Sequence, residues 1–554
     1  MPPVLLSSYK FQGYCNTLYK GNIPEMNDYL WWRDGVIYQV YPRSFSDSNN
    51  DGLGDLPGIT AHLDYLEQLG IDAIWLSPFY PTPDADFGYD ISNHTQVDAR
   101  FGTLQDFDNL LEQAHAHGIR IVLDLVLNHT SDQHPWFQES RSSLTNPKRD
   151  WYLWREKKNN WRSMTGGSGW KFDPLTNQYY YHMYLSEQPD LNWHNPEVRQ
   201  AQLDVIRFWL DRGVDGFRLD VFNIYFKDEG YKNNPVKVGL RSFDWQKHLY
   251  DSSQPEMYSL LNEFRNLLDT YPQRYSVGET FLATAEKAAS YVGDHLLHAA
   301  FSFDFTASHL MFPWNPRWLL QQVFIREKTF QGERWPATVM GNHDLPRTAS
   351  RYSHGENDAQ ARLAMTLLLT LRGTPFLYYG EEIGMRDISL SRRQIMDPPG
   401  KRYWPIYKGR DGCRSPMQWD DSAFSGFSSI QPWLPVHPDY LTRNAVQQDQ
   451  EPASMLNFTR TLIDLRKKHP ALRKGNFSPL VSKSRHVLAY LRQIPGQTIL
   501  VAMNFSGQKV KATFKPSITN RDWQPLLSTA GFKPPENGSI ELSPYTICIL
   551  VENN

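Results

Sequence analysis

The sequence is poor in cysteine, lacks long apolar runs and carries almost no net charge, and each shortage excludes a class of protein. Only three of the 554 residues are cysteine (Cys15, Cys413 and Cys548), which excludes a disulfide framework, and their spacing fits no zinc motif. No apolar run reaches the roughly 18–20 residues of a membrane span, so we expect no membrane partner. The 57 basic and 60 acidic residues give a net charge of −3, which argues against a nucleic-acid partner.

The first residues, MPPVLLSSYKFQ, have no basic segment and only a short apolar stretch, so no secretory signal is predicted. Together with the few cysteines, this favours a cytoplasmic enzyme. Aromatic residues, in contrast, are abundant: they make up 14% of the chain and include 18 Trp. Flat aromatic rings stack on the faces of sugars, but they also fill protein cores, so their abundance alone only hints at a carbohydrate ligand.

Short apolar strands alternate with amphipathic helices over most of the chain. The predicted strands begin at Gly35, Ile71, Ile119, Val214, Arg274, Ala300, Pro336 and Thr374. Apolar residues at helical spacing from Ile59 to Leu69 predict one helix that ends at Gly70. Thr103 with Asp106 resembles a capping box, and Asn195 before a proline is a predicted N-cap. Eight strands with helical crossovers predict an α/β fold with a closed (β/α)8 TIM barrel.

Two segments depart from this alternation. Residues 130–193 are polar and rich in Trp without a clear period, which is typical of a folded functional excursion. From about Gly475 the apolar residues recur every second position, as in antiparallel strands. The predicted organisation is therefore a catalytic barrel of residues 1–129 and 194–474, an inserted domain B of residues 130–193 after strand three, and a C-terminal antiparallel β-sandwich of residues 475–554.

Acidic residues lie on three of the predicted barrel strands. The fourth strand carries Asp220, the fifth ends in Glu279 and the seventh ends in Asp344. Arg218 lies two residues before Asp220 and so shares its face of the strand. Because catalytic groups of such barrels lie at the carboxyl ends of the strands, we expect the three acids to converge on one pocket. Two carboxyl groups flanking a scissile bond are the arrangement used in glycoside hydrolysis.

The segments DLVLNH, GFRLDVFN, GET and MGNHD resemble, in this order, the four signature regions of the α-amylase superfamily, glycoside hydrolase family 13. QPDLNW resembles a further motif of its oligo-1,6-glucosidase and α-glucosidase branch, and the likeness runs from about Trp31 to the end of the chain. The resemblance implies that Asp220 is a nucleophile, Glu279 the general acid/base and Asp344 a third acid that stabilises the transition state. Hydrolysis would then retain the anomeric configuration.

The same resemblance implies the residues that bind the sugar in the first subsite: Tyr89, His129, Arg218 and His343. It also implies that Asp86 and Arg414 grip the non-reducing end of the substrate. Such a grip would make the pocket blind and the enzyme exo-acting, with short α-glucosides as substrates. In one departure from the branch, Thr165 lies near a position where relatives often have Phe.

The linkage preference and the acceptor stay open. Val221, directly after the expected nucleophile, favours α-1,6 links by resemblance, but the segment from Asp397 to Asp420 is more like relatives with broader or α-1,4 preference. A sucrose isomerase or other transglucosylase, or a trehalose-6-phosphate hydrolase, is an alternative on the same fold. A catalytically inactive transporter subunit is disfavoured, because all three acids are present and a membrane segment is absent.

A second motif, DSNNDGLGD, predicts a metal loop. Its oxygen ligands would come from Asp47, Asn49, Asp51, the Leu53 carbonyl and Asp55, which repeat the first nine positions of an EF-hand loop. The twelfth position is a glycine and a strand precedes the loop, so this is not an EF-hand. It resembles the Ca²⁺ or Mg²⁺ loop of the same branch, and a polar turn without metal is the alternative. We expect a structural cation and no organic cofactor.

Overall fold

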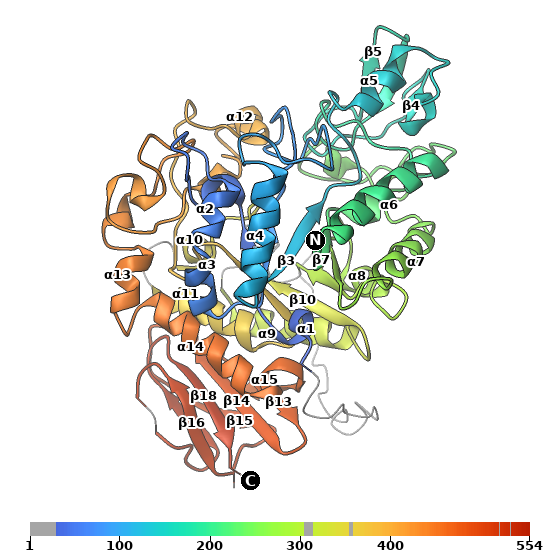
Figure 1. Ribbon diagram of the computed structural model, residues 1–554. Coiled ribbons are helices and arrows are strands. Elements are labelled where there is room, and N and C mark those ends of the chain that lie inside the picture. The colour runs from blue at the N-terminus through green and yellow to red at the C-terminus, as the bar shows by residue number, and fades with distance from the viewer. Residues whose placement is uncertain (1–28, 304–313, 354–357, 520, 532, 554) are drawn as a thin grey trace.

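The structure is a computed structural model that describes residues 29–303, 314–353, 358–519, 521–531 and 533–553; Cys15 lies outside these ranges. Within them, parallel strands close into a barrel in the order β1, β11, β10, β9, β8, β7, β3, β2 (Figure 1). This confirms the predicted fold class. The barrel strands are β1 (Ile37–Val40), β2 (Ala73–Leu76), β3 (Arg120–Leu125), β7 (Gly216–Leu219), β8 (Tyr275–Gly278), β9 (Ala299–Ser302), β10 (Trp335–Val339) and β11 (Thr374–Tyr378).

The barrel strands are buried on both faces, which explains their nearly continuous apolar sequences. Every residue of β1, β2, β7, β8, β10 and β11 is buried. The register between β3 and β7 places Asp124 beside Arg218. The register between β7 and β8 places Leu219 beside Gly278, so the residues that follow these two strands emerge at the same level.

Helices surround the barrel. Their bounds are α1 (Trp31–Asp34), α2 (Leu56–Thr60), α3 (Leu63–Leu69), α4 (Leu104–Ala116), α6 (Pro196–Asp211), α7 (Met257–Leu268), α8 (Ala285–Ser290), α9 (Pro316–Thr329), α10 (Thr348–Ser353), α11 (Asp358–Thr370), α12 (Pro398–Tyr403), α13 (Ala445–Gln450), α14 (Met455–Lys468) and α15 (Pro470–Lys474). No helix in the described ranges combines the length and the apolar character that crossing a membrane would need.

The local signals at two helix starts are confirmed. Thr103 and Asp106 form a reciprocal capping box at the start of α4. The Asn195 side chain accepts a hydrogen bond from the backbone N–H of Glu197 at the start of α6. The single helix predicted from Ile59 to Leu69 is wrong, because the structure divides this segment into α2 and α3.

Between β3 and α6 the chain forms a small domain with α5 (Pro135–Ser142) and the antiparallel strands β4 (Trp154–Arg155), β5 (Trp170–Asp173) and β6 (Gln178–Tyr181). Its core is aromatic: Phe137 packs against Tyr152, Trp154 and Tyr180 with ring centroids 5.0–5.7 Å apart. The Trp-rich excursion is therefore folded, and its rings pack against one another and against the adjoining barrel residues. In Figure 1 this domain extends from the upper end of the barrel, where β3 ends.

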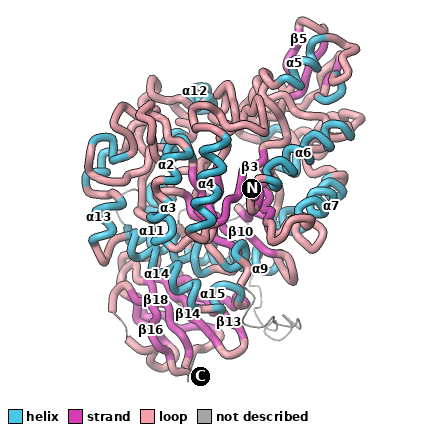
Figure 2. Tube along the Cα trace, in the orientation of Figure 1, coloured by secondary structure: helices cyan, strands magenta, loops and turns pink. Residues whose placement is uncertain are grey.

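The C-terminal region forms a seven-stranded antiparallel sheet in the order β16, β18, β14, β13, β12, β15, β17. Its strands are β12 (Asn476–Ser482), β13 (Val487–Ile494), β14 (Gln497–Asn504), β15 (Val510–Lys515), β16 (Trp523–Ser528), β17 (Ser539–Leu542) and β18 (Ile547–Glu552). Helix α15 contacts β13 and β14, and α9 contacts β12 and β13. Figure 2 shows this sheet at the end of the barrel opposite the inserted domain.

Candidate active site

The three predicted acids lie at the carboxyl ends of barrel strands. Asp220 directly follows β7, Glu279 directly follows β8, and Asp344 lies in the loop after β10. The backbone N–H of Asp220 donates to the Leu125 carbonyl (3.0 Å), and that of Glu279 donates to the Leu219 carbonyl (2.9 Å). The strand ladder therefore continues through both acids, and the barrel itself fixes where they stand.

Arg218 joins the acids through one buried guanidinium group. Its Nη1 donates to Asp124 Oδ1 and to Asp220 Oδ1, both at 2.6 Å, and its Nη2 donates to Glu279 Oε2. The guanidinium lies over the ring of Trp75, with its central carbon 5.1 Å from the ring centroid. A planar, permanently charged group can hold several carboxylates in fixed directions, so Arg218 sets the spacing of Asp220 and Glu279.

Asp344 is held by two arginines and lies beside a histidine. Its Oδ1 accepts hydrogen bonds from Arg410 (3.1 Å) and Arg414 (3.0 Å), and its Oδ2 lies 3.4 Å from His343 Nε2. Burial alone would raise the pKa of Asp344, but the positive charges of the two arginines hold that pKa well below its ordinary value. Asp344 is therefore a carboxylate at every physiological pH.

Glu279 has the opposite tendency. Burial raises the pKa of Glu279 to about 8, and although Arg218 lowers it, the negative charges of Asp220, Asp344 and Asp124 raise it further. The side chain is only 13% exposed. A carboxyl group that stays protonated at neutral pH beside fixed carboxylates has the property required of a general acid.

Tyr89, His129 and His343 enclose the same site. The Tyr89 ring stacks on His343 with centroids 5.2 Å apart and planes 6° apart, and its hydroxyl donates to Asp124 (3.1 Å). His129 Nε2 lies 2.9 Å from the Tyr89 carbonyl oxygen. Burial lowers the pKa of His343 to about 3, so this imidazole is neutral. The structure thus brings these three predicted sugar-binding residues together with the acids.

Comparison with known proteins agrees with this geometry. Residues 39–475 match the family model described as "Alpha amylase, catalytic domain", and residues 477–549 match "Maltogenic Amylase, C-terminal domain". The chain belongs to the α-amylase family. Its relatives place it among the glycoside hydrolases of the α-glucosidase and oligo-1,6-glucosidase branch.

Three similar proteins are informative. A probable α-glucosidase of Rhizobium meliloti is 43% identical over 501 residues, covering 86% of this chain and 90% of that protein. An oligo-1,6-glucosidase of Parageobacillus thermoglucosidasius is 38% identical over 512 residues, with 86% and 91% covered. The crystal structure of the α-glucosyl transfer enzyme XgtA is 40% identical and superposes with a TM-score of 0.89, over 95% of this chain and all of that one.

Asp86 pairs with Arg410 in this α-amylase family site. Arg410, not Arg414, contacts Asp86: Arg410 Nη2 donates to Asp86 Oδ1 at 2.6 Å, and also to Asp397 Oδ1 at 2.7 Å. Arg414 instead donates through Nε to the His343 carbonyl (2.8 Å) and through Nη2 to Asp344. Both arginines come from one short segment, GRDGCR, and its turn around Asp411–Arg414 decides which one faces Asp86.

Arg410 and Asp397 are therefore site residues that the sequence interpretation missed. Asp397 is fully buried, caps α12 by accepting from the backbone N–H of Gly400, and also bonds Arg410 Nε at 2.9 Å. The sequence signal for this pair was a D-P-P-G helix start thirteen residues before an arginine. Such a spacing does not by itself predict an ion pair. A third missed residue is Gln188 of QPDLNW, whose Nε2 lies 3.2 Å from Asp86 Oδ2.

The inserted domain and the loop around α12 meet beside this site. The Tyr403 hydroxyl donates to the Thr165 carbonyl oxygen at 2.8 Å. A side chain at Gly166 would overlap the Tyr403 hydroxyl, so the two loops approach closely only because position 166 is glycine. Tyr184 of the inserted domain lies on the other side, 5.6 Å from His129 and 6.0 Å from Phe281 between ring centroids.

The predicted metal loop is an ordered turn at the surface of the barrel. Asp47 Oδ1 accepts from the backbone of Asn50 (2.7 Å), and its Oδ2 accepts from Gly52 (2.8 Å) and Ser428 (2.6 Å). Asp55 Oδ1 accepts from Gly58 at 2.7 Å, as the N-cap of α2. Side-chain oxygens, a carbonyl and acidic residues suit a hard cation such as Ca²⁺. These hydrogen bonds occupy part of the capacity of the two carboxylates, each of which retains lone pairs.

Proposed function

We propose that this glycoside hydrolase is an exo-acting, retaining α-glucosidase that removes terminal α-linked glucose from short oligosaccharides. The observation that carries the proposal is the shared guanidinium of Arg218, which holds Asp220 and Glu279 side by side, with Asp344 across the same site. One of the paired carboxyl groups has a raised pKa, and Arg218 compensates the charge of the other.

In the first step, Asp220 attacks the anomeric carbon while Glu279 donates its proton to the departing glycosidic oxygen. The bond to that oxygen breaks and a glucosyl ester with Asp220 forms. In the second step, Glu279 accepts a proton from water, whose oxygen displaces Asp220 and releases glucose with its configuration retained. Positive charge that develops at the anomeric carbon is stabilised by the fixed negative charge of Asp344.

The exo mode is supported by the closed end of the site. Asp86, Arg410 and Asp344 form a continuous chain of ion pairs, with Arg410 bonded to both carboxylates. Asp86 is joined from the inserted domain by Gln188. We infer that a terminal glucose ends at this cluster, with its remaining hydroxyls bonded to Asp86 and Arg410, and that a longer chain cannot pass beyond it.

The linkage preference stays part of the proposal as α-1,4 and/or α-1,6. Val221 directly follows the proposed nucleophile and has left-handed backbone angles (φ 37°, ψ 37°), which are costly for a β-branched residue. Its side chain is buried in a cluster with Met183 and Phe243 at the base of the inserted domain. We propose that Val221, next to the nucleophile, limits how the second sugar approaches.

The test uses Asp220→Ala and Glu279→Gln, with Asp204→Ala on the exposed face of α6 as a matched control. We expect hydrolysis of an aryl α-glucoside to be lost in the first variant and the control to match wild type. On maltose, whose leaving group needs protonation, Glu279→Gln should fall by about 10²–10⁴-fold. Proton NMR of wild type should detect α-glucose before β-glucose. Activity in Asp220→Ala, or β-glucose as the first product, would refute the proposal.

Glucosyl transfer is the second candidate, favoured by the similarity to a structure described as an α-glucosyl transfer enzyme. In that case a second sugar or alcohol replaces water in the second step. Product analysis on maltose, isomaltose and sucrose distinguishes the two, because a transferase leaves little free glucose and accumulates new glucosides or isomers. Equal release of glucose and leaving group supports hydrolysis.

We further propose that the loop formed by Asp47, Asn49, Asp51, the Leu53 carbonyl and Asp55 binds one structural Ca²⁺ or Mg²⁺. The support is its set of oxygen donors, which lie in one turn between β1 and α2. Asn49 Oδ1 bonds the backbone of Asp51 (2.9 Å), and Asp51 Oδ1 bonds that of Leu53 (2.9 Å), so the loop is already wound. The cation would stabilise the conformation of this turn and take no part in the reaction.

A further inference from the structure

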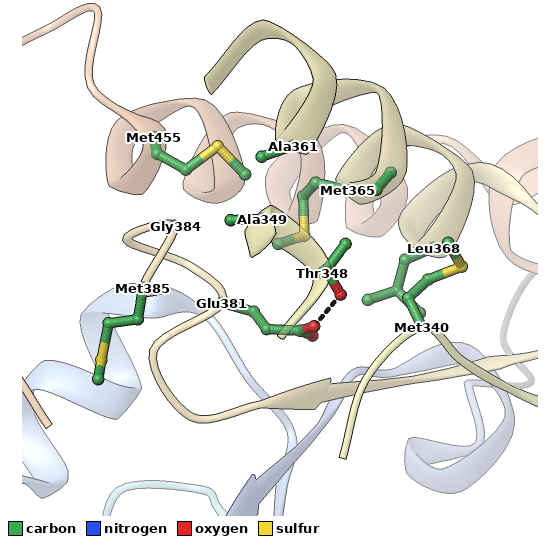
Figure 3. Close-up of a pocket in the computed structure, with 11 residues that line it drawn as sticks. Met340, Thr348, Ala349, Ala361, Met365, Leu368, Glu381, Gly384, Met385 and Met455 are labelled. Carbon is green, nitrogen blue, oxygen red and sulfur yellow. Dashed lines mark hydrogen bonds between the residues drawn. The ribbon is translucent and has the colours of Figure 1, made fainter. Parts of the chain in front are cut away.

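Glu381 is a buried acid that takes no part in the reaction proposed above. It follows β11 within the segment YYGEEIG and is 5% exposed. Its carboxylate lies against the loop of residues 341–348, which connects β10 to α10 and carries Asn342, His343 and Asp344. Figure 3 shows the Glu381 side chain directed towards Thr348, with a hydrogen bond between them.

The carboxylate of Glu381 contacts both ends of this loop. At the far end, Oε1 accepts the hydrogen bond of the Thr348 hydroxyl. At the near end, a side chain on Gly341 would overlap the same Oε1, so the carboxylate packs directly on the glycine backbone. The other oxygen, Oε2, accepts from the backbone N–H of Tyr378 at 3.3 Å, which fixes the carboxylate to its own strand.

The cavity beside Glu381 is too small to give this acid a ligand. It measures about 10 Å³, room for about one water molecule, and its other walls are the apolar side chains of Met340, Met365, Leu368 and Met455 (Figure 3). An isolated buried carboxylate is costly, so its retention here needs a structural partner. The Thr348 hydroxyl, which lines the cavity, and the Tyr378 backbone N–H supply such partners.

Other hydrogen bonds hold the same loop, in addition to the one between Thr348 and Glu381. The Arg347 backbone N–H donates to Asp387 Oδ1 (2.8 Å), and Arg347 Nη1 donates to the Tyr379 carbonyl (2.7 Å). Within the loop, the Asp344 backbone N–H donates to Asn342 Oδ1 at 2.9 Å. A loop fixed at both ends and braced in the middle transmits a shift at Thr348 to Asp344.

We propose that Glu381 is a positioning residue for the glucosidase reaction: by holding Gly341 and Thr348, it fixes the loop on which the Asp344 carboxylate meets the sugar. The inference rests on the proposed function, in which Asp344 stabilises the charge that develops at the anomeric carbon. A carboxylate that must face one atom tolerates little displacement, since a shift of about 1 Å can lower a rate about 100-fold.

The experiment compares four variants by kcat and KM on an aryl α-glucoside at a temperature where circular dichroism reports each as folded. Thr348→Val removes the hydroxyl at constant shape, and Thr348→Ser restores it. Glu381→Gln keeps the size of the side chain and can still bond Thr348 through its amide. Glu382→Gln is the matched control, because Glu382 is equally buried but bonds the hydroxyls of Tyr38 and Tyr65, away from the loop.

We expect Thr348→Val to lower kcat by about tenfold or more while KM changes by less than about threefold, because the transition state depends more than the ground state on Asp344. Thr348→Ser should recover kcat to within about twofold of wild type, and Glu381→Gln should lose less than Thr348→Val. The control, Glu382→Gln, should keep the wild-type kcat.

The proposal is overturned if Thr348→Val keeps the wild-type kcat, if Thr348→Ser is as impaired as Thr348→Val, or if Glu382→Gln loses as much. Failure of the proposed function looks different. A wild-type chain that releases no glucose from any α-glucoside, or an Asp344→Asn variant as active as wild type, would refute both. A normal wild type with an inactive Asp344→Asn and an unaffected Thr348→Val would refute the positioning role alone.

Discussion

Asp124 offers a way to test the electrostatics of the site without removing any group that touches the substrate. It shares Arg218 with the two reacting carboxyl groups, and its charge helps to raise the pKa of Glu279. Replacing Asp124 with Asn removes that charge at constant shape and leaves more of the guanidinium's attraction for Glu279. Both effects favour the ionised form of Glu279, so the pKa of Glu279 must fall.

The size of the fall follows from the geometry. Asp124 and Glu279 bond opposite terminal nitrogens of one guanidinium, which separates the two carboxylates by on the order of 6 Å. At an effective dielectric constant of about 20, two unit charges at that distance interact by about 3 kcal/mol, equivalent to about two pH units. Screening by Arg218 between them reduces the shift, so we expect a fall of about one to two units from the wild-type pKa of about 8.

The assay is the pH dependence of kcat/KM on an aryl α-glucoside, which reports the ionisation of the free enzyme. The general acid must be protonated, so wild-type activity should fall as the pH rises through about 8, and the variant should lose activity at about pH 6 to 7. The control is Asp173→Asn, a buried aspartate paired with Arg141 in the inserted domain, which should leave the profile in place. If the pKa at which kcat/KM falls on the alkaline side is the same in Asp124→Asn as in wild type, or higher, the reasoning is refuted.

Three further outcomes are expected. Arg410→Lys should raise KM for an aryl α-glucoside about tenfold, because a compact ammonium cannot span the three carboxylates that the planar guanidinium reaches, and an unchanged KM would contradict the closed end of the pocket. Thr103→Ala should lower the free energy of unfolding by about 1 kcal/mol in a denaturation experiment, whereas Thr103→Ser should not. Dialysis against a chelator should lower the melting temperature and added Ca²⁺ should restore it; an equal response in Asp51→Ala would exclude the proposed loop.

The barrel could be predicted from the sequence because its signals are local. The barrel strands are buried on both faces, and their sequences are accordingly nearly continuous apolar runs, such as Ile119 to Leu127, which Arg120 and Asp124 interrupt. Once the strands are placed, the topology puts their ends at one rim, so the convergence of Asp220, Glu279 and Asp344 follows without coordinates. The capping signals at Thr103 and Asn195 were equally local and were confirmed.

The failures come from contacts between distant parts of the chain. The break between α2 and α3 falls at His62, whose ring stacks on Trp419 with centroids 3.8 Å apart. No pattern near residue 62 reveals a partner more than three hundred residues away. The pairing of Arg410 with Asp86 is likewise set by the turn of a loop and by Asp397, and no local sequence pattern reveals it.

The hydrogen bond between Tyr403 and the Thr165 carbonyl has a consequence for engineering. One way to alter substrate range is to transplant a loop from a relative. Here the segment around α12 packs directly against the turn at Gly166. A transplant of either segment alone would therefore bring in a loop that does not fit the other. Chimaeras that exchange the two segments together should keep the contact between them and retain activity.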